Sequence, residues 1–189
     1  MPDMPPAYRR EGDRVLIELR LDSAQQLFDN RDPAPFQDKD LDPAAVAYIT
    51  EAAMELPPDS RLALVMHLPT AATAAAAGPE LTVAVSRFFG REAAATGRAL
   101  RALLADGRLA LLIGLAFLAA CLGLVSLLTE SGLDFGWPGR VVAEGLMIIG
   151  WVALWRPVEI FLYDWWPLRR RQRLLQRLAA MPLELRPDM

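Results

Sequence analysis

The chain has 189 residues, which is enough for one domain of ordinary size. Its formal net charge of −3 argues against a nucleic-acid-binding protein, because such proteins normally carry a basic surface. Cys121 is the only cysteine, which excludes an intramolecular disulfide and any metal site built from several cysteines. The first residues have neither a basic start nor an apolar core, so no cleavable signal peptide is expected.

The first part of the chain has the pattern of a small domain. Residues 1–13 are rich in proline and charge and are expected to form a disordered tail. Residues 14–108 are expected to form a cytoplasmic α/β domain. Within it, apolar residues at every second position of 15–21 indicate a half-buried strand. Asp22 and Ser23 can cap a short helix that follows this strand.

A longer helix and a second strand come next. Asp42 before Pro43 is a strong helix start, because the acid caps free N–H groups and proline suits the first helical position. This helix is expected to stop before Pro57. The apolar run 62–68 predicts a buried central strand. His67 interrupts that run without a partner at ligand spacing, so we expect a hydrogen-bonded structural histidine rather than a catalytic one.

An acidic segment lies between the two helices, over residues 29–42. A cation site is conceivable there, because carboxylate oxygens suit hard cations. The spacing departs from the calcium-loop pattern and the glycine for its sharp turn is missing, so a solvated surface loop is the preferred interpretation. The candidate acidic residues are Asp32, Asp38, Asp40 and Asp42.

The middle of the chain predicts a membrane span. The alanine-rich residues 71–78 end at Gly78-Pro79, which is expected to be a loop before a helix start, and a long helix is expected from Glu80 onward. Residues 109–128 carry no charge and would measure about 30 Å as a helix, which is close to the hydrocarbon thickness of a bilayer. We therefore predict the first transmembrane helix over 109–128.

A second span is expected after an external turn at residues 129–140. The apolar run 141–163 can form this second transmembrane helix. Three charged residues would lie within it: Glu144, Arg156 and Glu159. In the alternative, a shorter span ends at Trp155 and Pro157 opens an interfacial helix. The sequence leaves both possibilities open.

Arginines gather before the first predicted span and after the second, whereas the turn between them contains only Arg140. The positive-inside rule then places both termini in the cytoplasm and the turn outside. We expect a multi-pass protein of the bacterial inner membrane.

The C-terminal residues 164–189 are expected to return to the cytoplasmic domain as an arginine-rich helix and a final strand. Leu183 and Leu185 alternate with charged residues between two prolines, which is typical of an edge strand. The predicted fold class is therefore an α+β membrane protein. Its two-helix transmembrane hairpin is inserted in a small α/β domain of about three strands.

Three blocks together resemble an uncharacterised family of small bacterial two-span membrane proteins. These blocks are the acidic loop with its flanks at 27–42, the two-span hairpin, and the segment from Glu144-Gly145-Leu146 to Trp166-Pro167. The resemblance covers nearly the whole chain. That family has no established activity, so the resemblance implies no catalytic residue and no cofactor, but it directs attention to the acidic loop and the aromatic block.

The end of the second predicted span carries the main candidate site. At about 100° per residue, Arg156, Glu159 and Tyr163 fall within about 60° of one another on a helix. They suggest a ligand, lipid-headgroup or proton site, but a structural ion pair that anchors a bend at Pro157 is the preferred interpretation. Glu159 and Asp164 would lie about 140° apart. They should therefore not converge as a catalytic pair, and we expect no enzyme activity.

A basic and aromatic segment surrounds this candidate site. Arginines beside a membrane exit attract anionic lipids and also act as a topology signal. The candidate lipid-contacting arginines are Arg169, Arg170 and Arg171, and the candidate interface anchors are Trp155, Trp165 and Trp166. Small residues four apart in the first span, such as Ala110 and Gly114 or Ala119 and Gly123, allow close contact with the second span or with another molecule.

The sequence contains no nucleophile elbow, Walker loop, metal-ligand cluster or dinucleotide fingerprint. The leading hypothesis is a non-enzymatic, membrane-anchored interaction or assembly module whose cytoplasmic domain binds a protein partner or its own copies. The alternative is a lipid- or metabolite-binding enzyme or transport component that uses Arg156, Glu159 and Tyr163. Neither hypothesis involves a cofactor, a metal or nucleic acid.

Overall fold

The computed structural model describes residues 8–29, 39–69, 71–130 and 136–187, with the backbone alone for 71–78. The chain divides into two compact units. The first is an α/β unit, Met1–Thr96 with Arg170–Met189, and the second is a helical unit, Gly97–Arg169.

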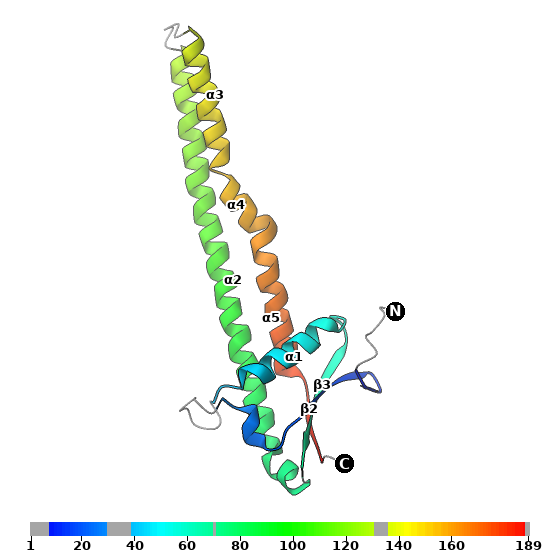
Figure 1. Cartoon of the computed structure of the whole chain (residues 1–189). Coiled ribbons are helices and arrows are strands. Elements are labelled where there is room, and N and C mark those ends of the chain that lie inside the picture. The colour runs from blue at the N-terminus through cyan, green and yellow to red at the C-terminus, as the bar shows by residue number, and fades with distance from the viewer. Residues whose placement is uncertain (1–7, 30–38, 70, 131–135, 188–189) are drawn as a thin grey trace. The chain divides into compact units, whose positions relative to one another are not determined.

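A four-stranded sheet organises the α/β unit (Figure 1). Its strands, in spatial order, are β1 (Arg10–Glu11), β2 (Arg14–Arg20), β3 (Arg61–Leu68) and β4 (Leu183–Pro187). β1 is antiparallel to β2, whereas β2, β3 and β4 are mutually parallel neighbours. The C-terminal strand pairs with β3, so all helices from Ala71 to Ala180 are inserted between two adjacent strands of one sheet.

The three predicted strands are present, with β3 inside the sheet and β4 at its edge. The fourth strand, β1, corrects the prediction of a disordered tail, because Arg10–Glu11 pair with Val15 and Arg14. Gly12 has a φ of +64°, a conformation that glycine adopts without strain, and this lets the chain reverse between β1 and β2. Residues 1–7 of the predicted tail lie outside the described part of the chain.

Local signals explain where the first helices begin. The Asp42 carboxylate accepts hydrogen bonds from the N–H groups of Ala44 (2.9 Å) and Ala45 (3.1 Å), so α1 (Pro43–Glu55) is capped as predicted. The short helix before it is a 3₁₀ helix, η1 (Ala24–Leu27), and the Ser23 side chain does not cap it. Instead, the N–H of Asp22 donates to the Gln26 side chain at 3.0 Å.

The long helix α2 (Ala71–Glu130) begins nine residues earlier than predicted and passes through Pro79. The expected loop at Gly78-Pro79 is therefore wrong. Alanine has the highest helix propensity of all residues, and a run of alanines can outweigh the single hydrogen bond lost at one proline near the helix start.

The core of the α/β unit lies on one face of the sheet, between the strands and the helices. It contains fully buried residues from β2, β3, α1, α2 and α5 (Trp165–Ala180), among them Ile17, Leu64, Ile49, Phe89 and Leu178. Sheet and helices from both ends of the sequence thus share one core. On the opposite face, the described residues form a small buried cluster of Leu16, Ala63 and Val65.

The helical unit is a hairpin. The Gly97–Glu130 part of α2 runs beside α3 (Gly136–Val152), α4 (Trp155–Glu159) and a π-helix, η2 (Ile160–Asp164) (Figure 1). The predicted turn at 129–140 is too long, because α2 continues to Glu130 and α3 already begins at Gly136; residues 131–135 lie outside the described part.

The second arm is interrupted close to the position where the two alternatives for the second span differ. α3 ends at Val152 and α4 starts at Trp155, so the interruption lies at residues 153–154, before Pro157. Pro157 is the third residue of α4, where a missing N–H leaves no helical hydrogen bond unmade.

Glycines bring the two arms of the hairpin close together. A β-carbon at Gly114 would lie 2.9 Å from the carbonyl oxygen of Ala153, and one at Gly107 would lie 2.8 Å from the Ile160 side chain. Gly107, Gly114 and the buried Cys121 are seven residues apart, so they follow one seam of the helix. Gly114 thus allows the second arm to approach closely, whereas Gly123 faces open space.

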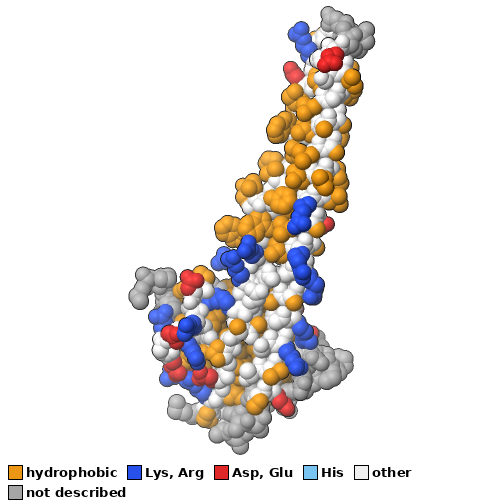
Figure 2. All heavy atoms as spheres, turned by 180° about the vertical axis from the view of Figure 1, so that it is seen from behind, with side chains coloured by type: hydrophobic (Ala, Val, Ile, Leu, Met, Phe, Trp, Pro, Cys, Tyr) orange, Lys and Arg blue, Asp and Glu red, His pale blue; other side chains and the backbone are white. Residues whose placement is uncertain are grey.

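Both arms present apolar side chains outward (Figure 2). The stretches Pro79–Glu130 and Gly136–Ala180 are long and apolar enough to cross a membrane, with mean hydropathies of 2.7 and 1.5 in their most apolar windows. Only 11% and 17% of those windows are buried, unlike the core helices of a water-soluble protein. The predicted fold class is confirmed at this level: a mixed α+β chain with two helices that could span a membrane.

Candidate functional site

Arg156 is the centre of a charged cluster at the end of the hairpin. Its Nη1 donates to Glu159 Oε2 at 3.0 Å and to Asp164 Oδ2 at 3.2 Å. The predicted pair of Arg156 with Glu159 is therefore present, and a second carboxylate joins it. The Arg156 side chain is 60% exposed, so the cluster is open to its surroundings.

The π-helix η2 explains why Asp164 belongs to this cluster. In an α-helix, residues five apart diverge, which led to the expectation that Glu159 and Asp164 point apart. That expectation is wrong, because a π-helix closes i→i+5 hydrogen bonds and five residues complete about one turn. Asp164 therefore returns to the side of the helix that carries Glu159.

Other predicted members of this site are arranged differently. Tyr163 is 70% exposed, and the ion pairs of Arg156 join only the two carboxylates. The Trp165 indole N–H donates to the carbonyl of Phe161 at 2.7 Å. The guanidinium of Arg169 lies 5.6 Å from the centre of that indole ring, within cation–π range. The predicted anchors Trp155 and Trp166 are exposed, as are Arg170 and Arg171.

The acidic loop does not assemble a cation site in the described part of the chain. Asp40 accepts a hydrogen bond from Arg91 at 2.8 Å, and Asp42 caps α1. Asp32 and Asp38 lie outside the described residues. Among the residues that are described, no three His, Cys, Asp or Glu side chains are grouped so that they could hold a metal ion.

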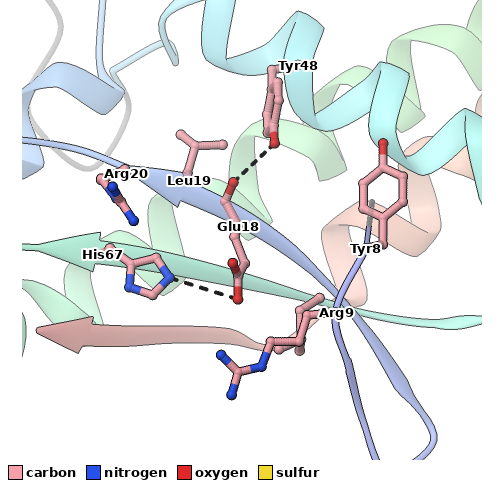
Figure 3. Close-up of a pocket in the computed structure, with 8 residues that line it drawn as sticks. Tyr8, Arg9, Glu18, Leu19, Arg20, Tyr48 and His67 are labelled. Carbon is pink, nitrogen blue, oxygen red and sulfur yellow. Dashed lines mark hydrogen bonds and ion pairs between the residues drawn. The ribbon is translucent and has the colours of Figure 1, made fainter. Parts of the chain in front are cut away.

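A cleft of about 350 Å³ in the α/β unit was not predicted (Figure 3). It is lined by Tyr8, Arg9, Leu16, Glu18, Leu19, Arg20, Tyr48 and His67. His67 Nε2 lies 4.0 Å from Glu18 Oε1, which is ion-pair range but too long for a hydrogen bond. Sequence spacing concealed this partner, because the parallel pairing of β2 with β3 brings Glu18 close to His67 across the strands.

The tyrosines of the cleft are already engaged. Tyr48 donates to the backbone carbonyl of Glu18 at 3.2 Å, and Tyr8 donates to the Glu55 carboxylate at 2.8 Å. Burial, followed by the hydrogen bond to Glu55, raises the pKa of Tyr8 to about 12. Glu18 Oε1 is buried and accepts no hydrogen bond from the described residues. The hydroxyl groups of Tyr8 and Tyr48 therefore have structural roles.

Charged side chains also link the edge strands across the face of the sheet opposite the main core. Arg186 of β4 donates to both oxygens of Glu11 in β1, at 2.7 and 2.6 Å, and to Glu184 at 2.8 Å. The hydrogen bonds from Arg186 lower the pKa of Glu11. This network joins the first and last strands of the sheet.

Comparison with protein-family models, curated proteins and solved structures finds no match to this chain. The resemblance to an uncharacterised bacterial family thus stays a prediction, and the functional argument depends on the geometry of the chain itself.

Proposed function

We propose that this chain is an integral protein of the bacterial inner membrane. In this proposal α2 and α3 cross the bilayer as a hairpin, and the α/β unit lies in the cytoplasm. The observation that carries the proposal is the outward apolar surface of both arms, with Leu112 66%, Leu127 67% and Ile148 63% exposed. Soluble monomers rarely expose contiguous apolar patches of this extent, whereas hydrocarbon accommodates them.

Charge placement supports the orientation. Arg98, Arg101 and Arg108 precede the apolar part of α2, and Arg169–Arg171 follow the second arm, whereas Arg140, near the start of α3, is the one arginine between Arg108 and Arg156. The positive-inside rule favours cytoplasmic termini. A reporter at either terminus should be active in the cytoplasm and one at Gly136 outside. A cytoplasmic signal from Gly136 would overturn the two-span arrangement.

The proposed role is that of a non-enzymatic, anchored interaction or assembly module. Many charged groups of the α/β unit are used structurally: Asp42 caps a helix, Asp40 pairs with Arg91, and Arg186 links Glu11 to Glu184. A domain whose charged groups are used in this way is better suited to binding than to catalysis. Purification of the full chain in mild detergent, followed by mass analysis of bound polypeptides, tests this role.

A second candidate role is the binding of a lipid or metabolite at the charged cluster, with anionic lipids at the arginine-rich segment. It is favoured by the π-helix, because such helices occur frequently at functional sites. In this role Arg156, Glu159 and Asp164 would contact a headgroup together with Tyr163. A stoichiometric lipid in native mass spectra, lost in Arg156→Leu, would favour this role over the first.

A further inference from the structure

The outer face of α3 carries a second stripe with seven-residue spacing. The inner face packs on α2, where a β-carbon added at Gly150 would lie 2.8 Å from the Leu118 side chain and 3.5 Å from that of Cys121. Residues at alternating steps of three and four share a different, outward face of the helix. They are Trp137, Arg140, Glu144, Met147 and Trp151, and all five are exposed.

Glu144 is the anomaly in this stripe. It lies eight residues into α3, about 12 Å along the helix axis from Gly136, and apolar residues flank it on both sides. An ionisable side chain inside a spanning helix is costly and almost always faces protein. Yet Glu144 is exposed and has no hydrogen-bond or ion-pair partner among the described residues.

Arg140 is in the same situation one turn earlier. It is exposed and makes no ion pair within the described residues, although Glu144 is only four positions away. An arginine placed before a glutamate at this spacing is the weaker order for a pair within one helix. The face therefore carries one cation and one anion that the described residues leave unmatched.

We propose that a second copy of this chain covers this face, with α3 packed parallel to the partner's α3. Glu144 then pairs with the partner's Arg140, and the twofold axis repeats the pair with the roles exchanged. Two carboxylates and two guanidinium groups give a neutral cluster. This inference rests on the proposed membrane placement, because only in hydrocarbon is an unmatched charge costly enough to require a partner.

The neighbouring residues suit such an interface. A β-carbon added at Gly145 would meet no atom within 4 Å, so the backbone beside Glu144 is open to close approach. Trp137 and Trp151, 77% and 64% exposed, provide large apolar anchors at the two ends of the stripe. A single polar position in an otherwise apolar seam also fixes the register of the two helices.

Disulfide trapping of the full chain in its native membrane tests the proposal. In a Cys121→Ser background, Met147→Cys should form a covalent dimer on mild oxidation, whereas Leu127→Cys, exposed on α2, should not. Glu144→Arg or Arg140→Glu should each lower the trapped fraction by about tenfold, because like charges then meet at the seam. The double exchange Arg140→Glu with Glu144→Arg should restore it.

Each contrary result has its own meaning. The reciprocal pair would be overturned if Leu127→Cys and Met147→Cys were trapped equally. It would also be overturned if both single charge changes abolished the dimer and the double exchange did not restore it. A crosslink to a different polypeptide would replace the second copy by another partner. Release of the parent chain by an alkaline wash would instead refute the membrane placement itself, and this wash is therefore measured first.

Discussion

Glu159 and Asp164, five residues apart, accept hydrogen bonds from the same nitrogen of Arg156, at 3.0 and 3.2 Å. Two like charges are held together by one guanidinium group, at the point where the π-helix replaces the α-helix. The positive charge of Arg156 therefore balances one of the two negative charges and weakens the repulsion between the two carboxylates.

This arrangement predicts an unequal response to substitution. Arg156→Leu leaves two neighbouring carboxylates without a cation, whereas Glu159→Gln or Asp164→Asn still leaves a matched pair. We expect Arg156→Leu to lower the yield of folded protein most, with each lost contact contributing about 1 kcal/mol or less because the groups are partly exposed. Fluorescence-detected size exclusion in detergent measures the folded fraction.

The matched controls are a triple change and a distant arginine. Replacing Arg156, Glu159 and Asp164 together with Leu, Gln and Asn should recover much of the yield, because no charge is left unpaired. Arg170→Leu, at an exposed position on α5, should have little effect. If Arg156→Leu folds as well as Arg170→Leu, the cluster is not structural and the lipid-binding role becomes the better explanation.

Capping and periodicity predicted much of the fold. Asp42-Pro43 predicted the start of α1, and the apolar run 62–68 predicted β3 as an inner strand. The strand β1 was not predicted, because its two residues are too few to establish a period. The start of α2 was misjudged at Gly78-Pro79, where local breakers were given more weight than the alanine run before them.

The candidate site was harder to predict than the fold, because it depends on departures from regular geometry. A π-helix shifts the helical register, and no residue type in the segment 160–164 indicates a π-helix from the sequence. The approach of His67 to Glu18 requires the register of two parallel strands, which the chain fixes only through its tertiary packing. The Arg156–Glu159 pair was predictable since it needs only one ordinary helical turn.

Gly114 and Gly123 form a matched pair for testing the hairpin. Gly114→Ala would place a β-carbon 2.9 Å from a backbone oxygen of Ala153, so the two arms must separate. Gly123→Ala meets no atom within 4 Å and should stabilise α2 by up to about 1 kcal/mol through helix propensity alone. Thermal unfolding in detergent should therefore shift down for Gly114→Ala and remain level or rise for Gly123→Ala. Equal shifts would contradict the observed contact.

The shared core predicts that the C-terminal segment stabilises the N-terminal one. Leu178 is fully buried among residues of the sheet and α1, so Leu178→Ala should destabilise the α/β unit by about 2–5 kcal/mol. Gln176→Ala, at an exposed position of α5, serves as the control. Truncation after Ala180 removes β4 and should make residues 8–69 sensitive to protease. Unchanged protease resistance after this truncation would mean that β4 contributes nothing to the unit.

The raised pKa of Tyr8 predicts that the folded protein loses stability in alkali. Its pKa is raised from 10.0 to about 12, first by burial and then by the hydrogen bond to Glu55. Between these values the unfolded chain releases the Tyr8 proton while the folded chain keeps it, so the unfolded state binds fewer protons. The stabilisation is complete below pH 10 and is lost as the pH rises toward about 12.

Two substitutions check the origin of this alkaline effect, with unfolding midpoints measured across that pH range. Tyr8→Phe removes the titrating group, so the decline in stability should become shallower. Glu55→Gln removes the carboxylate that accepts the Tyr8 hydrogen bond but leaves the burial, so the pKa of Tyr8 should fall only part of the way back toward 10. The chain has three tyrosines, so this pKa is read from the part of the tyrosinate absorbance that Tyr8→Phe removes. If Glu55→Gln leaves the titration of Tyr8 unchanged, burial alone sets it, and the contact between Tyr8 and Glu55 has no part in holding the chain before β1 against α1.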